Sequence, residues 1–151
     1  MVQSTISGHT GLGKRLEKQI KEYAGRELKD KARSFATSLI ANTPIQPTAK
    51  FSIGAYANSF SFKINNTSSR GRRLKGSTSV SDAKSRIQEG QVYNPQEGFN
   101  KLLSDVENAD YSDVKTMTFR NDSQHASQVE NGTGWRRDGY HVFRNAKASF
   151  K

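Results

Sequence analysis

Apolar residues recur at three- and four-residue steps through residues 16–40, which is the spacing of an amphipathic helix. They are Leu16, Ile20, Tyr23, Ala24, Leu28, Ala32, Phe35, Ala36, Leu39 and Ile40. Charged residues fill most positions between them. Because Pro44 disfavours helical backbone at the residue before it, we expect one helix from Lys14 to about Asn42, roughly 40 Å long, with these residues on one face.

Two later stretches alternate apolar and polar residues, as half-buried strands do. In the first, 59–65, the apolar positions are Phe60, Phe62 and Ile64; in the second, 114–120, they are Met117 and Phe119. The sequence therefore predicts two short strands.

Shorter helical patterns surround the second strand. Residues 81–90 could form a polar helix, and residues 94–107 form a better one because Pro95 suits a first turn and its apolar residues share a face. Apolar steps over 140–150 predict a short C-terminal helix. Residues 1–13 are rich in Ser, Thr and Gly, and we expect an arm there.

Together these elements predict a single α+β domain over residues 1–151. A long N-terminal amphipathic helix packs on a small antiparallel sheet, and a short helix closes the chain. Residues 67–113 are expected as a polar insertion with a short helix.

The stretch from His125 to Trp135 combines an apolar pair, Ala126 and Val129, with glycines and the only tryptophan. Asn-Gly and Gly-x-Gly favour positive φ. We expect the chain to turn sharply here rather than continue a helix or strand.

The net charge of the chain indicates what kinds of partner it could bind. The chain has 24 Lys+Arg and 14 Asp+Glu, a net charge of +10, which favours polyanions or acidic protein surfaces as partners. Its apolar content is roughly 36% by the usual count, against about 45–50% in typical globular chains. The core should be thin and in part completed by neighbouring subunits. Cysteine is absent, and we expect neither a secretion signal nor a membrane span.

The densest positive cluster contains Arg70, Arg72, Arg73 and Lys75 in a Gly- and Ser-rich stretch. It could grip phosphates without sequence preference. It could equally be a solvated insertion or pair with an acidic neighbouring subunit.

An acidic patch follows at Asp105, Glu107, Asp110 and Asp113. Its spacing fits no EF-hand loop, so we expect no metal there. A solvated or interface patch fits better, and it could be the counterpart of the basic cluster on a neighbouring copy.

The histidines are the candidates for acid–base chemistry near neutral pH, but nothing in their spacing selects a pair. They are His9, His125 and His141. The glycines of residues 8–13 lack the strand and Gly-Lys-Ser/Thr of a nucleotide loop. We expect no catalytic site, no metal and no cofactor.

Four segments, in this order, resemble the minor tail-completion or neck proteins of tailed bacteriophages, which join head to tail. Thr43-Pro44 ends the long helix, and the segment 54–60, from Gly54 to Phe60, leads into the first strand. The segment 125–133 contains the Ala-x-x-Val-Glu-x-Gly-Thr pattern, with Val129, Glu130, Gly132 and Thr133 at its marked positions, and residues 140–150 match the closing helix. Four features depart from the family pattern: His125 replaces a preferred Tyr, the loop after Pro44 is longer, Ile53 rather than Thr precedes Gly54, and 67–113 has no counterpart.

The resemblance implies structural roles for these residues. Gly54 and Gly132 would serve backbone geometry, Val129 and Trp135 would serve packing, and Glu130 could cap a helix or pair with a neighbour's basic residue.

It also implies a function. The chain would be a virion protein of the neck, assembled in the host cytoplasm, forming a homo-oligomeric ring between portal or adaptor and tail. Its basic surface would line the channel through which packaged DNA passes. The alternative from the residues alone is a free-standing basic nucleic-acid-binding protein, and a small basic nuclease is a weaker third possibility.

Overall fold

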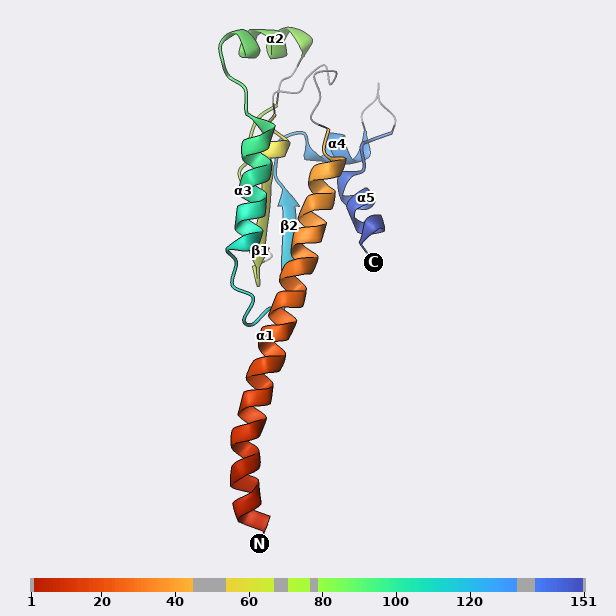
Figure 1. The fold of residues 1–151 in the computed structure, drawn as a ribbon. Helices are drawn as coiled ribbons and strands as arrows, with labels where there is room; N and C mark the ends of the chain where they lie inside the picture. The colour runs from red at the N-terminus through yellow and green to blue at the C-terminus, as the bar shows by residue number, and fades with distance from the viewer. Residues whose placement is uncertain (1, 45–53, 67–70, 77–78, 133–137, 151) are drawn as a thin grey trace.

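The computed structural model describes residues 2–44, 54–66, 71–76, 79–132 and 138–150, with the side chains of the first helix described from Gly11 onward. The fold is α+β, with a long N-terminal helix, a two-stranded antiparallel sheet and further short helices (Figure 1). The elements are α1 (Val2–Asn42), a 3-10 turn η1 (Ala57–Ser59), β1 (Phe60–Ile64), α2 (Val80–Gln88), α3 (Pro95–Glu107), β2 (Met117–Asn121), α4 (Ala126–Asn131) and α5 (Val142–Ser149).

The sheet pairs β1 with β2 so that Phe62 lies opposite Phe119 and Ile64 opposite Met117. This register puts the apolar positions of both strands on one face, because side chains alternate along a strand. The rings of Phe62 and Phe119 lie 4.6 Å apart between centroids. The alternation in the sequence therefore predicted the buried face correctly.

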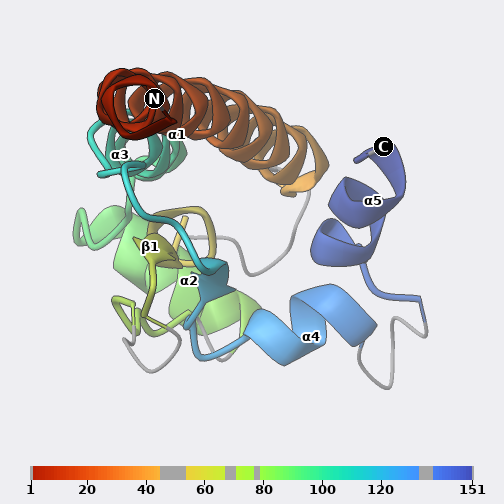
Figure 2. The same ribbon diagram turned by 90° about the horizontal axis from the view of Figure 1, so that it is seen from below.

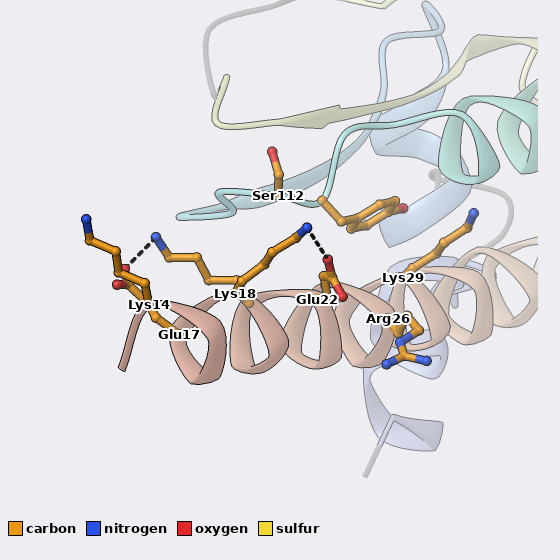
Figure 3. A pocket seen from close by; sticks show the side chains of 10 residues that line it. Lys14, Glu17, Lys18, Glu22, Arg26, Lys29 and Ser112 are labelled. Carbon is orange, nitrogen blue, oxygen red and sulfur yellow. Dashed lines mark ion pairs between the residues drawn. The ribbon is translucent and has the colours of Figure 1, made fainter. Parts of the chain in front are cut away.

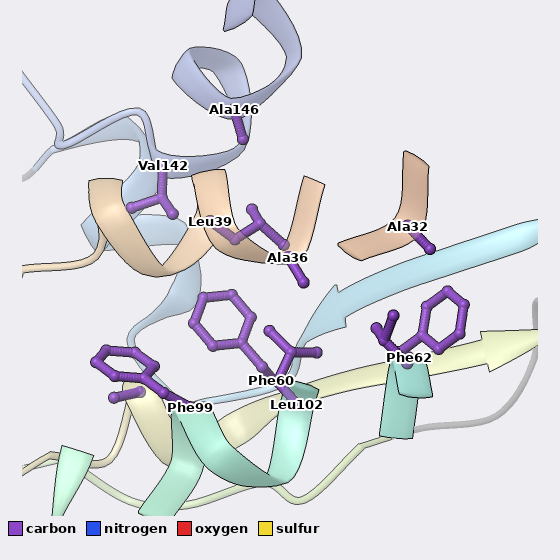
Figure 4. Packing of buried hydrophobic residues seen from close by; sticks show 11 residues of the cluster. Ala32, Ala36, Leu39, Phe60, Phe62, Phe99, Leu102, Val142 and Ala146 are labelled. Atoms are coloured by element: carbon purple, nitrogen blue, oxygen red, sulfur yellow. The ribbon is translucent and has the colours of Figure 1, made fainter. Parts of the chain in front are cut away.

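Helices α1 and α3 cover this phenylalanine face, and α5 packs against α1 on the side away from α3 (Figures 1 and 2). Figure 4 shows Ala36 and Leu39 of α1 above Phe60, with Leu102 of α3 beside it. The buried residues of this core are Ala32, Ala36, Leu39, Ala57, Phe60, Phe62, Phe99, Leu102, Val106, Val142 and Ala146. A single small core therefore holds the three helices and the sheet together.

The range 67–113, expected as a polar insertion, contributes α3 to this core. Asn94 caps α3 by accepting a hydrogen bond from the Gln96 amide at 3.0 Å, and Pro95 occupies its first turn. Both are the start signals that the sequence shows.

The first helix begins earlier than expected. Residues 2–13, predicted as an irregular arm, continue α1, whose 41 residues span about 60 Å. Glycine lowers helix propensity by only ~1 kcal/mol per residue, so Gly11 and Gly13 weaken the helix without ending it. The predicted end is confirmed: α1 stops at Asn42, and the Thr43 hydroxyl donates to the Leu39 carbonyl at 2.7 Å.

The apolar residues of α1 do not share one face, which corrects our expectation. Four-residue steps advance about 40° per step around a helix that turns about 100° per residue. The apolar row therefore winds around α1. Ala32, Ala36 and Leu39 face the core at 0–1% exposure, whereas Leu16 and Ile20 are 49% and 66% exposed.

Two smaller differences concern the C-terminal third. β2 runs from Met117 to Asn121, slightly later than predicted. Residues 126–131 form α4, a helix that we did not predict because it is one and a half turns long; the sharp turn starts after it, at Gly132 with φ +86°. The described helices include none with the length and hydrophobicity needed to cross a bilayer.

Candidate interaction surfaces

The basic segment, residues 71–76, is anchored by its backbone and one apolar side chain. Leu74 is 7% exposed and packs with Ala55 and Ala83, while the Gly71 amide donates to the Asp122 carboxylate. The guanidinium of Arg86 in α2 donates to the Gly76 carbonyl at 2.9 Å. These contacts hold the segment in place while its charged side chains stay outside.

Those side chains are the predicted cations. The Arg72 guanidinium lies 5.9 Å from the centroid of the Tyr93 ring, a cation–π distance. Arg73 and Lys75 are exposed. Arg70 lies outside the described residues. The segment therefore presents a compact positive surface beside α2.

The predicted aspartates line one open hollow of about 540 Å³ at the opposite end of the sheet. We call it the acidic hollow; it is lined by Phe62, Lys63, Ile64, Asn65, Asp105, Asn108, Ala109, Asp110, Ser112 and Asp113. The Asn65 side chain braces it by donating to the Asp113 carbonyl at 2.6 Å and accepting from the Lys115 amide at 2.7 Å.

Part of this negative charge is balanced within the chain. Asp105 pairs with Lys101 at 2.8 Å, and the Asp110 carboxylate accepts from the Ser112 amide at 2.9 Å. Asp113 is exposed. Asp110 and Asp113 thus keep their negative charge available to a partner.

Glu107, which we grouped with these aspartates, instead joins α3 to α1. Its carboxylate pairs with Lys29 and Arg33, each at 2.8 Å. Hydrogen bonds from these two cations lower the pKa of Glu107 to about 2. Glu107 is therefore a structural residue of the domain.

The basic segment and the acidic hollow do not meet within one chain. Gly71 lies beside Ser61 near the start of β1, and the Leu74 carbonyl accepts from the Gln124 amide just after β2. The hollow surrounds Asn65, just past the other end of β1. One small domain therefore carries opposite charges at the two ends of its sheet.

Both motif glycines lie in backbone conformations that favour glycine. Gly54 has φ +78° and Gly132 has φ +86°, a region that L side chains rarely adopt. A Cβ on Gly54 would also collide with the Tyr93 carbonyl. Pro44 follows the end of α1, and Phe60 is buried at 4% exposure.

Glu130 caps a helix within the chain, which is one of the two roles we considered. Its carboxylate accepts hydrogen bonds from the amides of Phe143 and Arg144, both at 3.1 Å, at the start of α5. Two more backbone bonds, Tyr140 to Val129 and His141 to Glu130, tie α4 to this start. Val129 packs against the core. Thr133 and Trp135 lie outside the described residues.

His125 precedes α4 and His141 precedes α5. The ring of His125 lies against Gly76 of the basic segment. The side chain of His9 lies outside the described part of α1. Among the described residues, no group of three or more His, Cys, Asp or Glu is arranged to hold a metal ion.

Sequence reasoning missed a groove between α1 and the turn after α3. Its volume is about 890 Å³, and Figure 3 shows Lys14, Lys18 and Glu22 along the α1 side with Ser112 opposite. The groove is charged because the winding apolar row has left this side of the helix. Ion pairs along the helix, Lys21–Glu17 at 2.9 Å and Lys18–Glu22 at 3.8 Å, line it.

The other side of the same half of α1 is apolar and exposed. Leu12, Leu16, Ile20 and Tyr23, here called the apolar stripe, are 49–66% exposed. The winding period of the apolar row indicates that part of the row leaves the core face, but not which part, and we expected a single face.

Comparison with models of known protein families, with curated proteins and with solved structures finds no significant match.

Proposed function

We propose that this chain is a structural, non-catalytic virion protein of a tailed bacteriophage. It forms a homo-oligomeric ring at the neck, between the portal or adaptor complex and the tail, and lines the channel that DNA passes through. Before assembly it resides in the host cytoplasm. This function rests on the order of motifs in the sequence together with the surfaces described above.

The observation that carries the proposal is the opposite charge at the two ends of the sheet. Head-to-tail contacts in a ring use two different surfaces of each subunit. Arg73 and Lys75 of one copy are suited to meet Asp110 and Asp113 of the next. Complementary charge fixes the register of such a contact more than it adds affinity.

The remaining positive charge suits a channel wall. The groove of α1 carries Lys14, Lys18, Lys21, Arg26 and Lys29 against two glutamates. Such a surface attracts phosphates without reading bases. The motif residues support the same proposal through the fold, because Gly54, Gly132 and Glu130 shape its turns and α5.

Light scattering of the purified protein, with and without tailless heads of the same phage, tests the proposal. We expect either a ring or a subunit that binds heads in fixed stoichiometry. A stable monomer that ignores heads would contradict it.

Charge variants then locate the contact. Arg73→Glu with Lys75→Glu should abolish the ring or head binding, and adding Asp110→Lys with Asp113→Lys should restore part of it. Lys147→Glu, an exposed change on α5, is the matched control and should leave assembly intact.

The alternative is a free-standing nucleic-acid-binding protein, favoured by the exposed cations of the basic segment. Such a protein would shift short duplex DNA and lose affinity steeply as salt rises. The neck protein should bind DNA weakly while binding heads well.

A further inference from the structure

The apolar stripe has no cover within the described chain. Leu12, Leu16, Ile20 and Tyr23 are 53%, 49%, 66% and 62% exposed. Side chains of this size exposed together on one helix face mark an interaction site.

The stripe also faces away from its own domain. At about 100° per residue, its centre lies about 175° around α1 from Ala32, Ala36 and Leu39, which contact the core. Gly25, on the core side, is the point where the Tyr111 backbone meets the helix. The rest of the domain contacts the opposite side of α1 and therefore cannot bury the stripe by shifting along the helix.

We propose that the stripe pairs with the same stripe of a second copy, with the two α1 helices antiparallel. The four stripe residues are spaced almost symmetrically about residue 18. Leu16 and Ile20 each lie two residues from it, and Leu12 and Tyr23 lie six and five residues from it. An antiparallel pair therefore sets Leu16 against Ile20 of the second copy, and Leu12 against its Tyr23.

The charges beside the stripe select this direction. Arg15 and Glu22 lie on the same edge of the stripe, within about 20° of each other around the helix. In an antiparallel pair, this edge of one helix lies against the same edge of the other helix. Arg15 of each copy therefore lies opposite Glu22 of the other copy, which gives two symmetric ion pairs. A parallel pair would instead bring Glu22 to the opposite edge, which carries Glu17, a residue of its own sign.

Both residues are available for this pairing. Arg15 is exposed, and the only ion pair of Glu22 among the described residues is with Lys18 at 3.8 Å, between side chains that are 59% and 79% exposed. Exposed pairs of this kind contribute little, so Glu22 can exchange one partner for another.

The α1 surface that the second helix would cover is exposed. When the pair is centred near residue 18, the N-terminal end of the second helix extends along the first helix to about residue 34. The residues of the first helix on this path are all exposed: Glu27, Asp30, Lys31 and Ser34. The acidic hollow and most of the groove lie on the other side of α1, and Glu22 stands at the border between the groove and the stripe. The pairing therefore does not depend on the neck role, and it leaves the ring surfaces of the acidic end open.

Light scattering of the purified protein over a range of concentrations tests the pairing. In the Arg73→Glu/Lys75→Glu background, which removes the proposed ring contact, we expect a mass of twice 16.8 kDa at the upper end. Leu16→Glu with Ile20→Glu should give the monomer mass throughout. Lys14→Glu, with the same new charge on the opposite side of α1, should leave the dimer intact.

A charge exchange tests the direction. Arg15→Glu or Glu22→Arg alone should raise the dimer dissociation constant by about ten-fold, because two symmetric pairs become repulsive. The double variant should restore it, since each reversed residue meets the other across the twofold axis. Circular dichroism should show equal helix content in all variants.

The proposal is overturned if the wild type is monomeric at every concentration, if the stripe variant stays dimeric, or if the double charge variant fails to recover. A monomeric wild type whose head binding is lost in Leu16→Glu/Ile20→Glu would show that another virion protein covers the stripe. That result would overturn the pairing while supporting the proposed function.

Discussion

The two halves of α1 belong to one continuous helix with one repeating apolar pattern, yet their apolar side chains lie in different surroundings. In residues 28–42, Ala32, Ala36 and Leu39 are buried, and Phe35 and Ile40 pack partly buried against the same core. In residues 11–24 the apolar side chains are exposed and charged ones face the domain. The difference teaches that a four-residue repeat on a 3.6-residue helix changes the direction of its apolar row, so one sequence pattern buries side chains at one end and exposes them at the other.

The boundary between the halves is made by contacts from outside α1. Tyr111 approaches the backbone at Gly25, where an added Cβ would lie 2.9 Å from its carbonyl oxygen. One turn later, Lys29 and Arg33 hold Glu107 of α3. The N-terminal part of α1 projects beyond the domain (Figure 1).

The sharpest contrast should come from removing one leucine in each half. Leu39→Ala should lower the free energy of unfolding by about 3 kcal/mol, because it leaves a cavity in the core. Leu16→Ala should change it by less than about 0.5 kcal/mol, as exposed positions do. Urea unfolding at a concentration where the protein is monomeric measures both. Equal losses would show that the halves fold as one unit.

The packing of the buried half should also depend on the cap of α5. Glu130→Ala should cost about 1–2 kcal/mol, because two amide groups lose their acceptor at the helix start. Glu130→Gln keeps an acceptor and should cost less. Thermal unfolding of the two variants gives the comparison. If Gln costs as much as Ala, the charge rather than the hydrogen bonds stabilises α5.

Replacing a glycine in the projecting half should change the helix stability of that half alone. Nothing lies within 4 Å of a Cβ added to Gly13. Gly13→Ala should stabilise the local helix by ~1 kcal/mol and slow amide exchange around it by about five-fold. The urea midpoint should not move. A raised midpoint would mean that residues 11–24 unfold together with the core.

The smallest effect concerns the ion pairs at the boundary. Because Lys29 and Arg33 lower the pKa of Glu107 from 4.5 to about 2, its contribution to stability is complete above pH 4.5 and disappears as the pH falls to about 2. The stability difference between wild type and Glu107→Gln should shrink over this range. A difference that stays constant would show that the pairs do not act through charge.

The sequence predicted most of the core but not the projecting surface. Alternation located β1 and its partner, and Pro95 with the apolar face behind it located α3, because strand alternation and helix starts are local properties. The burial of Leu39 and the exposure of Leu16 depend on where Tyr111 and α3 meet α1, which is a tertiary property. The role of Glu130 was similarly open, since its amide partners at Phe143 and Arg144 are distant in sequence.

The candidate surfaces were predicted in part. The aspartates at 105, 110 and 113 do gather in one hollow, but Glu107 does not serve with them because two cations of α1 reach it first.

Amide hydrogen exchange along α1, measured at low and high protein concentration, tests the central claim most directly. We predict that residues 28–42 are protected equally at both concentrations, because the domain core covers them. Residues 11–24 should be weakly protected at low concentration and gain protection as copies associate. Equal protection of both halves that does not change with concentration would contradict the account.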